Sequence, residues 1–127
     1  MESLKKEASK SSPKIEFDAN TSILKIEGKS YMENPAAFYE PIIYWVDEFV
    51  KISDKPVVFD INIDYLNTSS TKIFMNIFDI LESYYQSGKK ITINWHYDPE
   101  NDFGKETGDE YQEDYELPFN VIEIKPI

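Results

Sequence analysis

Apolar and polar residues alternate in several short segments of the chain, which is the pattern of strands that bury one face. The clearest segment covers residues 56–64, with apolar side chains at every second position. Residues 14–17 and 22–27 alternate in the same way around a polar turn, which predicts a β-hairpin. Residues 90–97 and 119–124 supply two further strands. The segment 56–64 has polar side chains on its second face, so we expect one face of the sheet to lie open.

Two longer segments have apolar residues at helical spacing. The first begins at Asn34-Pro35, a cap residue followed by a proline suited to the first helical position. Pro41 lies inside this helix and is expected to kink it or to split off a short first turn. The second helix follows Asn67-Thr68-Ser69-Ser70 and ends before Gly88, a residue suited to the end of a helix.

The order of these elements predicts the fold class. A hairpin, a helix, a strand, a helix, a strand, an acidic connection and a last strand form a two-layer α/β domain. We expect a mixed sheet of about five strands with helices packed mainly on one face. Residues 1–13 are polar and are predicted to be a disordered tail, and residues 14–127 to be a single domain.

Composition and charge exclude several classes of function. The chain of 127 residues has no cysteine, and its only histidine is His96, so disulfides and Cys- or His-rich metal sites are excluded. The formal net charge is −11, which opposes binding to nucleic acid or to an anionic membrane surface. No apolar run is long enough to span a membrane. We therefore expect a cytoplasmic protein without a cofactor.

The negative charge is concentrated at residues 98–116, which contain nine acidic residues and one lysine. Aligned to a calcium-binding loop, this segment has Phe103 where the loop needs glycine. We interpret it as a solvated acidic loop, with a short helix near 109–115, that can steer a basic partner. Elsewhere, Asp60 and Asp64 share one face of a strand without any sign of a substrate pocket, and His96 has no partner that would make it catalytic.

The run Asn67-Thr68-Ser69-Ser70 carries the most specific chemistry. Its simplest interpretation is a cap that satisfies free N–H groups at a helix start. The alternative is a phosphate site, because the N-terminus of a helix favours an anion and the loop follows a strand. A phosphate on Thr68 would add about −1.5 to −2 charges to the surface. The loop contains no glycine and is not a nucleotide-binding P-loop.

Several blocks of the sequence closely resemble the SiaC family of regulatory phosphoproteins. The blocks extend from about Ile15 to Ile124, and the most specific is Asn67-Thr68-Ser69-Ser70-Thr71-Lys72. The others are Ile26-Glu27-Gly28-Lys29-Ser30-Tyr31, Asn34 with Phe38-Tyr39-Glu40-Pro41, Asn94-Trp95-His96-Tyr97 and Glu116-Leu117-Pro118-Phe119. Two positions depart from the family pattern, since Leu66 and His96 stand where aromatic residues are expected.

The resemblance implies a fold akin to that of anti-sigma-factor antagonists and a non-enzymatic partner switch. A dedicated protein kinase would phosphorylate Thr68, and a PP2C-type phosphatase would remove the phosphate. The unphosphorylated form would bind and activate a diguanylate cyclase, which raises cyclic di-GMP and favours aggregation or biofilm. Asn67, Ser69, Ser70 and Lys72 would shape the surface that these partners recognise.

Two other hypotheses remain open at the level of the sequence. The domain could be an interaction module without a phosphoswitch, binding through the open sheet face or the acidic segment 98–116. It could also be an enzyme that uses a metal held by the acidic cluster, although no ligand set or nucleophile–base pair is visible.

Overall fold

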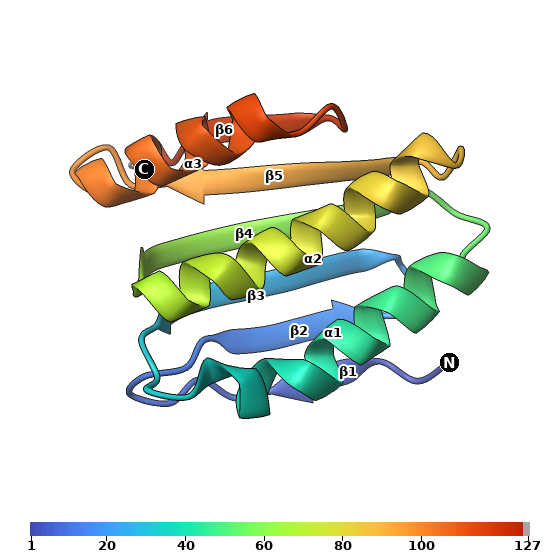
Figure 1. Cartoon of the computed structure of the whole chain (residues 1–127), viewed down its shortest axis with the longest axis horizontal. Helices are drawn as coiled ribbons and strands as arrows, with labels where there is room; N and C mark the ends of the chain where they lie inside the picture. Colours follow the sequence, from blue (N-terminus) through green and yellow to red (C-terminus); the bar gives the residue numbers. More distant parts are fainter. Residues whose placement is uncertain (126–127) are drawn as a thin grey trace.

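The computed structural model describes residues 1–125, which form one six-stranded sheet and three helices. The strands are β1 (Leu4–Lys6), β2 (Lys14–Asp18), β3 (Ile23–Ser30), β4 (Val57–Leu66), β5 (Ile91–Tyr97) and β6 (Phe119–Glu123). The helices are α1 (Pro35–Ile52), α2 (Thr68–Gln86) and α3 (Asp102–Asp114). All three helices lie on the same side of the sheet, so the molecule has two layers (Figure 1).

The strands lie in the sheet in the order in which they follow one another along the chain. The pairs β1–β2 and β2–β3 are antiparallel, and the pairs β3–β4, β4–β5 and β5–β6 are parallel. The predicted hairpin at the N-terminal side is therefore confirmed, and the unit from β4 through α2 to β5 is a parallel crossover. The predicted α/β class, a mixed sheet with helices on one face, is also confirmed.

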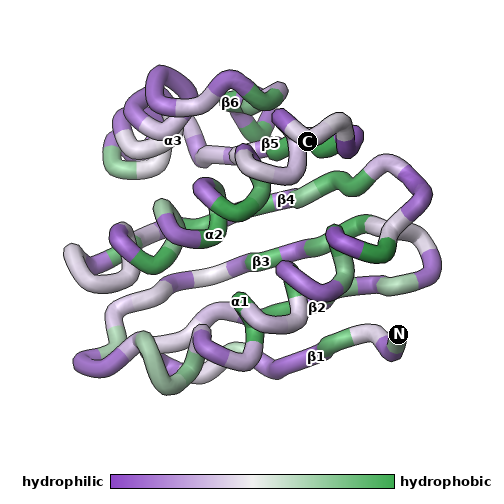
Figure 2. The backbone as a smooth tube through the Cα atoms, turned by 45° about the vertical axis from the view of Figure 1, so that its right-hand side comes forward, coloured by the Kyte–Doolittle hydropathy of each residue, from purple (hydrophilic) through white to green (hydrophobic). Residues whose placement is uncertain are grey.

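The core lies between the helices and one face of the sheet. Its largest fully buried side chains include Trp95, Phe59, Phe74 and Phe78. The apolar residues of the alternating pattern are buried in this layer. Figure 2 shows the hydrophobic residues as green stretches along the strands and helices. The opposite face of the sheet holds polar residues such as Lys25, Asp60 and Asn94 and is left uncovered, as the alternation predicts.

The predicted disordered tail differs from the structure. Residues 4–6 form strand β1, which pairs with β2 in the register Leu4–Phe17 to Lys6–Ile15. Trp45 in α1 holds the segment before β1, because its Nε1 donates to the carbonyl oxygen of Glu2 at 2.9 Å. β1 raises the strand count from about five to six. Of the domain predicted at 14–127, residues 126–127 lie outside the described residues.

The acidic segment also differs from the expected solvated loop, because most of it is the 13-residue helix α3. Asn101 caps this helix by accepting a hydrogen bond from the N–H of Gly104. The buried residues Gly104, Gly108 and Tyr111 form the inner side of the helix, and Gly108 lies against the indole of Trp95. The expected short helix near 109–115 is the second half of α3.

α1 is a single helix from Pro35 to Ile52. Pro41 lies inside it and does not split off a short first turn. The apolar face of α1 is buried on both sides of Pro41, at Tyr39 and at Ile42. We infer that this packing keeps the helix continuous although the proline removes one backbone hydrogen bond. None of the helices among residues 1–125 is both long enough and apolar enough to cross a membrane.

Candidate functional site

Thr68 is the first residue of α2 and follows the carboxyl end of β4 by two positions. This end of the molecule, on the left in Figure 1, also holds the ends of β3 and β5 and the start of α3. The side chains of Thr68 and Ser69 are exposed. Their N–H groups belong to the first turn of α2, where backbone donors have no partner inside the helix. An anion on the Thr68 hydroxyl would therefore meet free donors and the positive end of the helix dipole.

Asn67 fixes this helix start with three hydrogen bonds. Its Oδ1 accepts from the N–H of Ser70 at 2.9 Å, which is the standard bond of an N-cap. Its Nδ2 donates to the carbonyl oxygen of Met32 at 3.1 Å, and its own N–H donates to the carbonyl oxygen of Ser30 at 3.0 Å. The capping function predicted for this run belongs to Asn67, which leaves the Thr68 hydroxyl free of a structural task.

A chain of buried hydroxyl groups lies directly beneath the helix start. The Oγ atoms of Ser30 in β3 and Ser70 in α2 are 2.8 Å apart, and the hydroxyl of Tyr39 in α1 donates to Ser30 Oγ at 2.8 Å. All three residues are 0% exposed. Burial raises the pKa of Tyr39 above its ordinary value, so the phenol stays a donor. These hydrogen-bonded hydroxyl groups join α1, β3 and α2 under Thr68.

The structure separates the residues that the sequence grouped around Thr68. Ser69 and Lys72 are exposed, and Lys72 lies one helical turn after Thr68 on the same side of α2. Asn67 is half-buried. Ser70 is fully buried, so it supports the helix start from inside and does not reach the surface that a partner would touch.

A β-bulge beside this site was not anticipated from the sequence. Gly28 pairs with Ile63 and Lys29 with Tyr65, so Asp64 is an extra residue in β4. The carbonyl oxygen of Asp64 accepts a hydrogen bond from Asn101 Nδ2 at 2.9 Å. Because of the extra residue, Ile63 and Leu66 both point into the core while Tyr65 is 45% exposed. Bulges re-aim side chains in this way next to functional sites.

Tyr65 lines a shallow hollow of about 540 Å³ next to Thr68, together with Lys29, Tyr31 and Asn67. The ring of Tyr65 packs at 5.1 Å from that of Phe103 at the start of α3. Exposed tyrosines are enriched at binding surfaces. The only signal for this hollow in the sequence was a pair of tyrosines at strand ends. Tyr31 directly follows β3, and Tyr65 is the last residue but one of β4.

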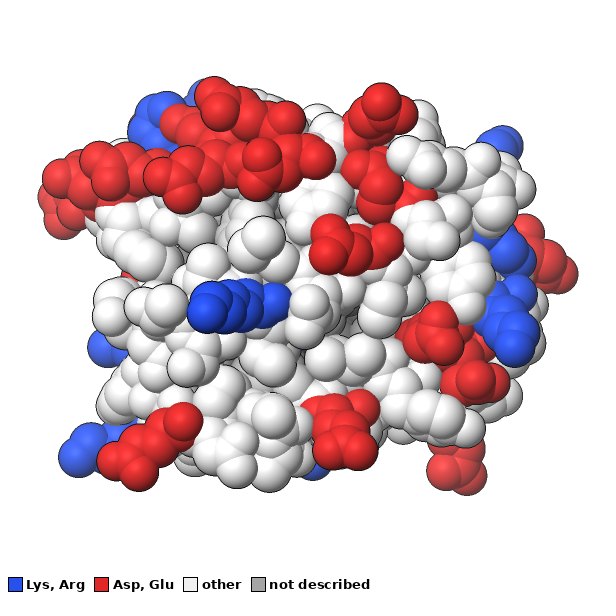
Figure 3. All heavy atoms as spheres, viewed as in Figure 1, with Lys and Arg blue, Asp and Glu red and all other residues white. Residues whose placement is uncertain are grey.

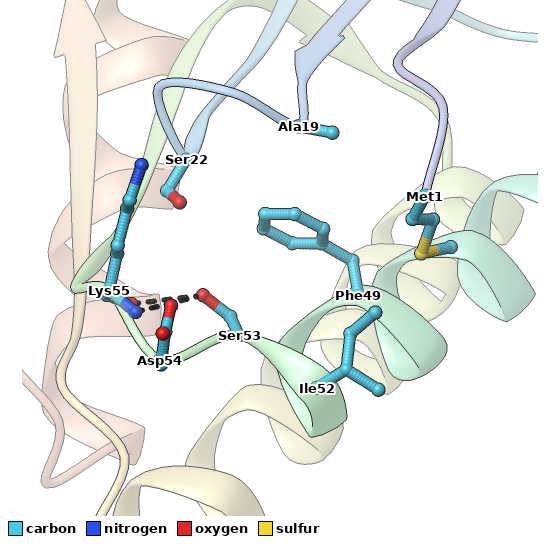
Figure 4. Close-up of a pocket in the computed structure, with 8 residues that line it drawn as sticks. All are labelled: Met1, Ala19, Ser22, Phe49, Ile52, Ser53, Asp54 and Lys55. Atoms are coloured by element: carbon cyan, nitrogen blue, oxygen red, sulfur yellow. Dashed lines mark hydrogen bonds between the residues drawn. The ribbon is translucent and has the colours of Figure 1, made fainter.

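A smaller hollow of about 220 Å³ lies at the other end of the sheet, where β3 and β4 begin (Figure 4). Met1, Phe49 and Ile52 supply its apolar side, and Ser53, Asp54 and Lys55 its polar side. The polar groups bond to the backbone: Ser53 Oγ donates to the carbonyl oxygen of Lys55 at 3.0 Å. This hollow offers no pair of nucleophile and base.

The polar residues of the open sheet face form a hydrogen-bonded cluster. Asp60 Oδ1 lies 3.3 Å from His96 Nε2 and accepts from Asn94 Nδ2 at 3.2 Å. Asn120 Nδ2 donates to Asn94 Oδ1 at 3.0 Å. His96 is therefore a hydrogen-bonded strand residue, and its carboxylate partner Asp60 was not anticipated from the sequence. Within residues 1–125, no three Asp, Glu or His side chains come together in a way that could hold a metal ion.

The one-sided mixed sheet and the exposed threonine at a capped helix start define a small two-layer α/β domain. The chain belongs to the SiaC family of regulatory phosphoproteins, whose family model matches residues 6–124. This confirms the resemblance seen in the sequence. The chain is also 37% identical, over 111 residues, to an uncharacterized protein of Pseudomonas aeruginosa strain UCBPP-PA14; the match covers 87% of this chain and 88% of that protein.

Solved structures agree with the family assignment. The crystal structure of apo-SiaC from Pseudomonas aeruginosa matches with a TM-score of 0.91 and 34% identity over 96% of this chain and 99% of that one. The structure of the diguanylate cyclase SiaD in complex with its activator SiaC, from the same organism, contains a chain that matches with a TM-score of 0.90 and 35% identity. That match covers 95% of this chain and 99% of the other.

Proposed function

We propose that this protein is a phosphorylation-controlled binding switch whose phosphoacceptor is Thr68. A partner kinase phosphorylates Thr68 and a PP2C-type phosphatase removes the phosphate. The unphosphorylated form binds and activates a diguanylate cyclase in cyclic di-GMP signalling. The observation that carries the proposal is the position of Thr68: its hydroxyl is exposed at a helix start that Asn67 already caps.

The geometry supports a phosphate at this position for three reasons. The free N–H groups of the first turn can donate to it, and the helix dipole favours its charge. Lys72 follows by four residues, a spacing at which opposite charges on a helix attract. Lys72 is in none of the ion pairs found among residues 1–125, so its charge is available to a phosphate or to a partner.

The hollow formed by Lys29, Tyr31, Tyr65 and Asn67 is the surface that we assign to the cyclase. It adjoins Thr68, so a phosphate there would change the charge at the edge of the contact by about −1.5 to −2. The proposal that the target is a diguanylate cyclase rests on the solved complex between the cyclase SiaD and its activator SiaC. This protein is 35% identical to the matching chain of that complex.

The direct test compares two variants of Thr68 in a pull-down with the diguanylate cyclase of the same organism. Thr68→Ala is expected to bind the cyclase constitutively, and Thr68→Asp is expected to bind at least tenfold more weakly because it places a permanent charge at the contact. Ser83→Ala, an exposed hydroxyl fifteen residues further along α2, is the matched control and should behave like the wild type. Equal binding by the Ala and Asp variants would sink the switch.

The same experiment distinguishes the phosphorylation switch from the alternative, an interaction module without a switch. In that case, both Thr68 variants bind like the wild type, and the binding is lost when charges of α3 or of the open sheet face are reversed. Among residues 1–125, no contact favours that alternative over the surface beside Thr68.

A further inference from the structure

A third hollow, of about 380 Å³, lies between α1 and α2 on the helical side of the molecule. Asp47 of α1 and Asp79, Ile80, Ser83 and Tyr84 of α2 line it. The hydroxyl of Tyr84 donates to Asp47 Oδ1 at 2.7 Å, which joins the two helices across the hollow. The hollow is therefore a fixed feature of the α1–α2 packing and is separate from the surface beside Thr68.

Apolar residues flank the hollow. Ile80 is half-buried in its lining. Ile43 precedes Asp47 by one turn of α1, and Ile73 precedes Ile80 by seven residues on α2, so helix spacing places each on the same side of its helix as a residue that lines the hollow. Ile43 and Ile73 are partly buried and pack against the core. A side chain entering the hollow would therefore meet apolar contacts.

The rim of the hollow is acidic. Asp47 Oδ1 accepts from Tyr84, and Asp79 Oδ1 accepts from Tyr115 at 2.9 Å. These bonds hold each carboxylate in place and use one oxygen of each. The three helices contain eleven acidic residues and three lysines, a net charge of −8, which is most of the −11 of the chain. Figure 3 shows acidic side chains over α3 and across the helical side, with few basic ones between them.

The hollow is too far from Thr68 to respond to its phosphate. Asp79 follows Thr68 by eleven residues, which is about 16 Å along the helix axis. Charges at the surface are largely screened beyond about 8 Å at physiological ionic strength. A change of charge at the start of α2 therefore leaves the field at the hollow almost unaltered.

We propose that the α1–α2 groove, defined by Ile43, Asp47, Asp79, Ile80 and Ser83, is a docking site for a basic amphipathic helix of a partner protein. An apolar face with residues one turn apart fits a seam between two helices, and flanking lysines or arginines pair with Asp47 and Asp79. This site binds its partner equally in the presence and absence of a phosphate on Thr68. If Thr68 is the switch, such a site lets one partner enzyme recognise both the phosphorylated and the unphosphorylated form of the protein.

The test uses a labelled 18-residue helical peptide with leucine on one face and lysine on the other, titrated by fluorescence anisotropy. A scrambled peptide of the same composition controls for simple charge attraction and is expected to bind at least tenfold more weakly. Ser83→Arg, at an exposed position in the hollow, should weaken binding of the helical peptide at least tenfold. Gln86→Arg makes the same change of charge about one turn further on and should weaken it less than twofold.

Thr68→Glu should change the affinity for the peptide less than twofold, and amide shifts on peptide binding should lie at residues 43–47 and 79–84. Equal weakening by Ser83→Arg and Gln86→Arg, or shifts concentrated in α3 or the sheet, would overturn the groove. So would equal binding of the scrambled peptide, or an absence of saturable binding. Because the peptide assay does not require Thr68 to be a phosphoacceptor, its failure is distinguishable from failure of the switch.

Discussion

At the scale of single residues, the site depends on a division of labour between neighbours in one short run. Asn67 closes the helix start, Ser70 anchors it to β3 and α1 from inside, and Thr68 presents its hydroxyl to solvent. The run was recognisable in the sequence because asparagine, serine and threonine favour helix starts. Which of its hydroxyls is buried was not recognisable, because that depends on Ser30 and Tyr39, which come from other elements.

The two cap residues of α1 and α2 allow a matched test of this division. Asn67→Ala should lower the free energy of unfolding by about 1–2 kcal/mol, because it removes a cap bond and the bond to Met32. Asn34→Ala should cost clearly less, because the Asn34 side chain makes no cap hydrogen bond at the start of α1. Urea unfolding of both variants measures the difference, and equal losses would contradict the importance of the Asn67 cap.

At the scale of elements, α3 shows where reading the sequence alone was insufficient. Its acidic composition suggested a solvated loop, and its two glycines also disfavour a helix. In the structure, both glycines face Trp95 and Tyr97, and Trp95 Nε1 donates to the carbonyl oxygen of Gly104 at 2.8 Å. Close packing on one tryptophan outweighs the low propensity. A pairing of that kind between distant residues leaves no periodic signal in the sequence.

The same contact reverses the usual effect of replacing glycine in a helix. A methyl group at position 108 would lie 2.5 Å from Trp95 Cδ1, so Gly108→Ala should destabilise the protein by about 1–3 kcal/mol. At an exposed helical position, the same substitution would stabilise by up to about 1 kcal/mol. Glu110→Ala, on the exposed side of α3, is the control and should be near neutral. A thermal unfolding midpoint for Gly108→Ala at or above the wild type would contradict the packing.

The strands and α2 were predictable for the opposite reason. In β4, the alternation of residues is local and places Phe59 and Ile61 in the core without information from other elements. β1 escaped notice because it has only three residues, two of them lysines. The bulge at Asp64 and the hollow it helps to form depend on how β3 and β4 pair, which a single strand does not reveal.

At the scale of the whole molecule, tyrosine hydroxyls connect the helical segments of one layer to each other. Burial raises the pKa of Tyr111. Burial is also the larger cause of the raised pKa of Tyr115, and a hydrogen bond to Asp79 adds to it. The hydrogen bond to Asp47 raises the pKa of Tyr84 to about 12. Each folded-state pKa lies above the ordinary value of about 10. The protonated phenols therefore stabilise the fold fully below pH 10, and this contribution is lost as the pH rises further.

A titration of tyrosinate absorbance tests this for Tyr84. In the wild type, the Tyr84 phenol should ionise near pH 12, and this step should be missing in Tyr84→Phe. Asp47→Asn should move the ionisation of Tyr84 to lower pH, because the carboxylate acceptor is gone. Asp54→Asn, an exposed carboxylate beyond the end of α1, is the control and should leave it in place. An unchanged titration of Tyr84 in Asp47→Asn would show that this bond does not set its pKa.

The central claim is that Thr68 carries the regulatory phosphate, and its most direct measurement is phosphosite mapping on the protein purified from its native host. Intact mass and fragment spectra across growth conditions should show one added phosphate, located at Thr68, in part of the population and none at the neighbouring Ser69. A Thr68 that is unmodified under every condition, or a phosphate found only at another residue, would contradict the account.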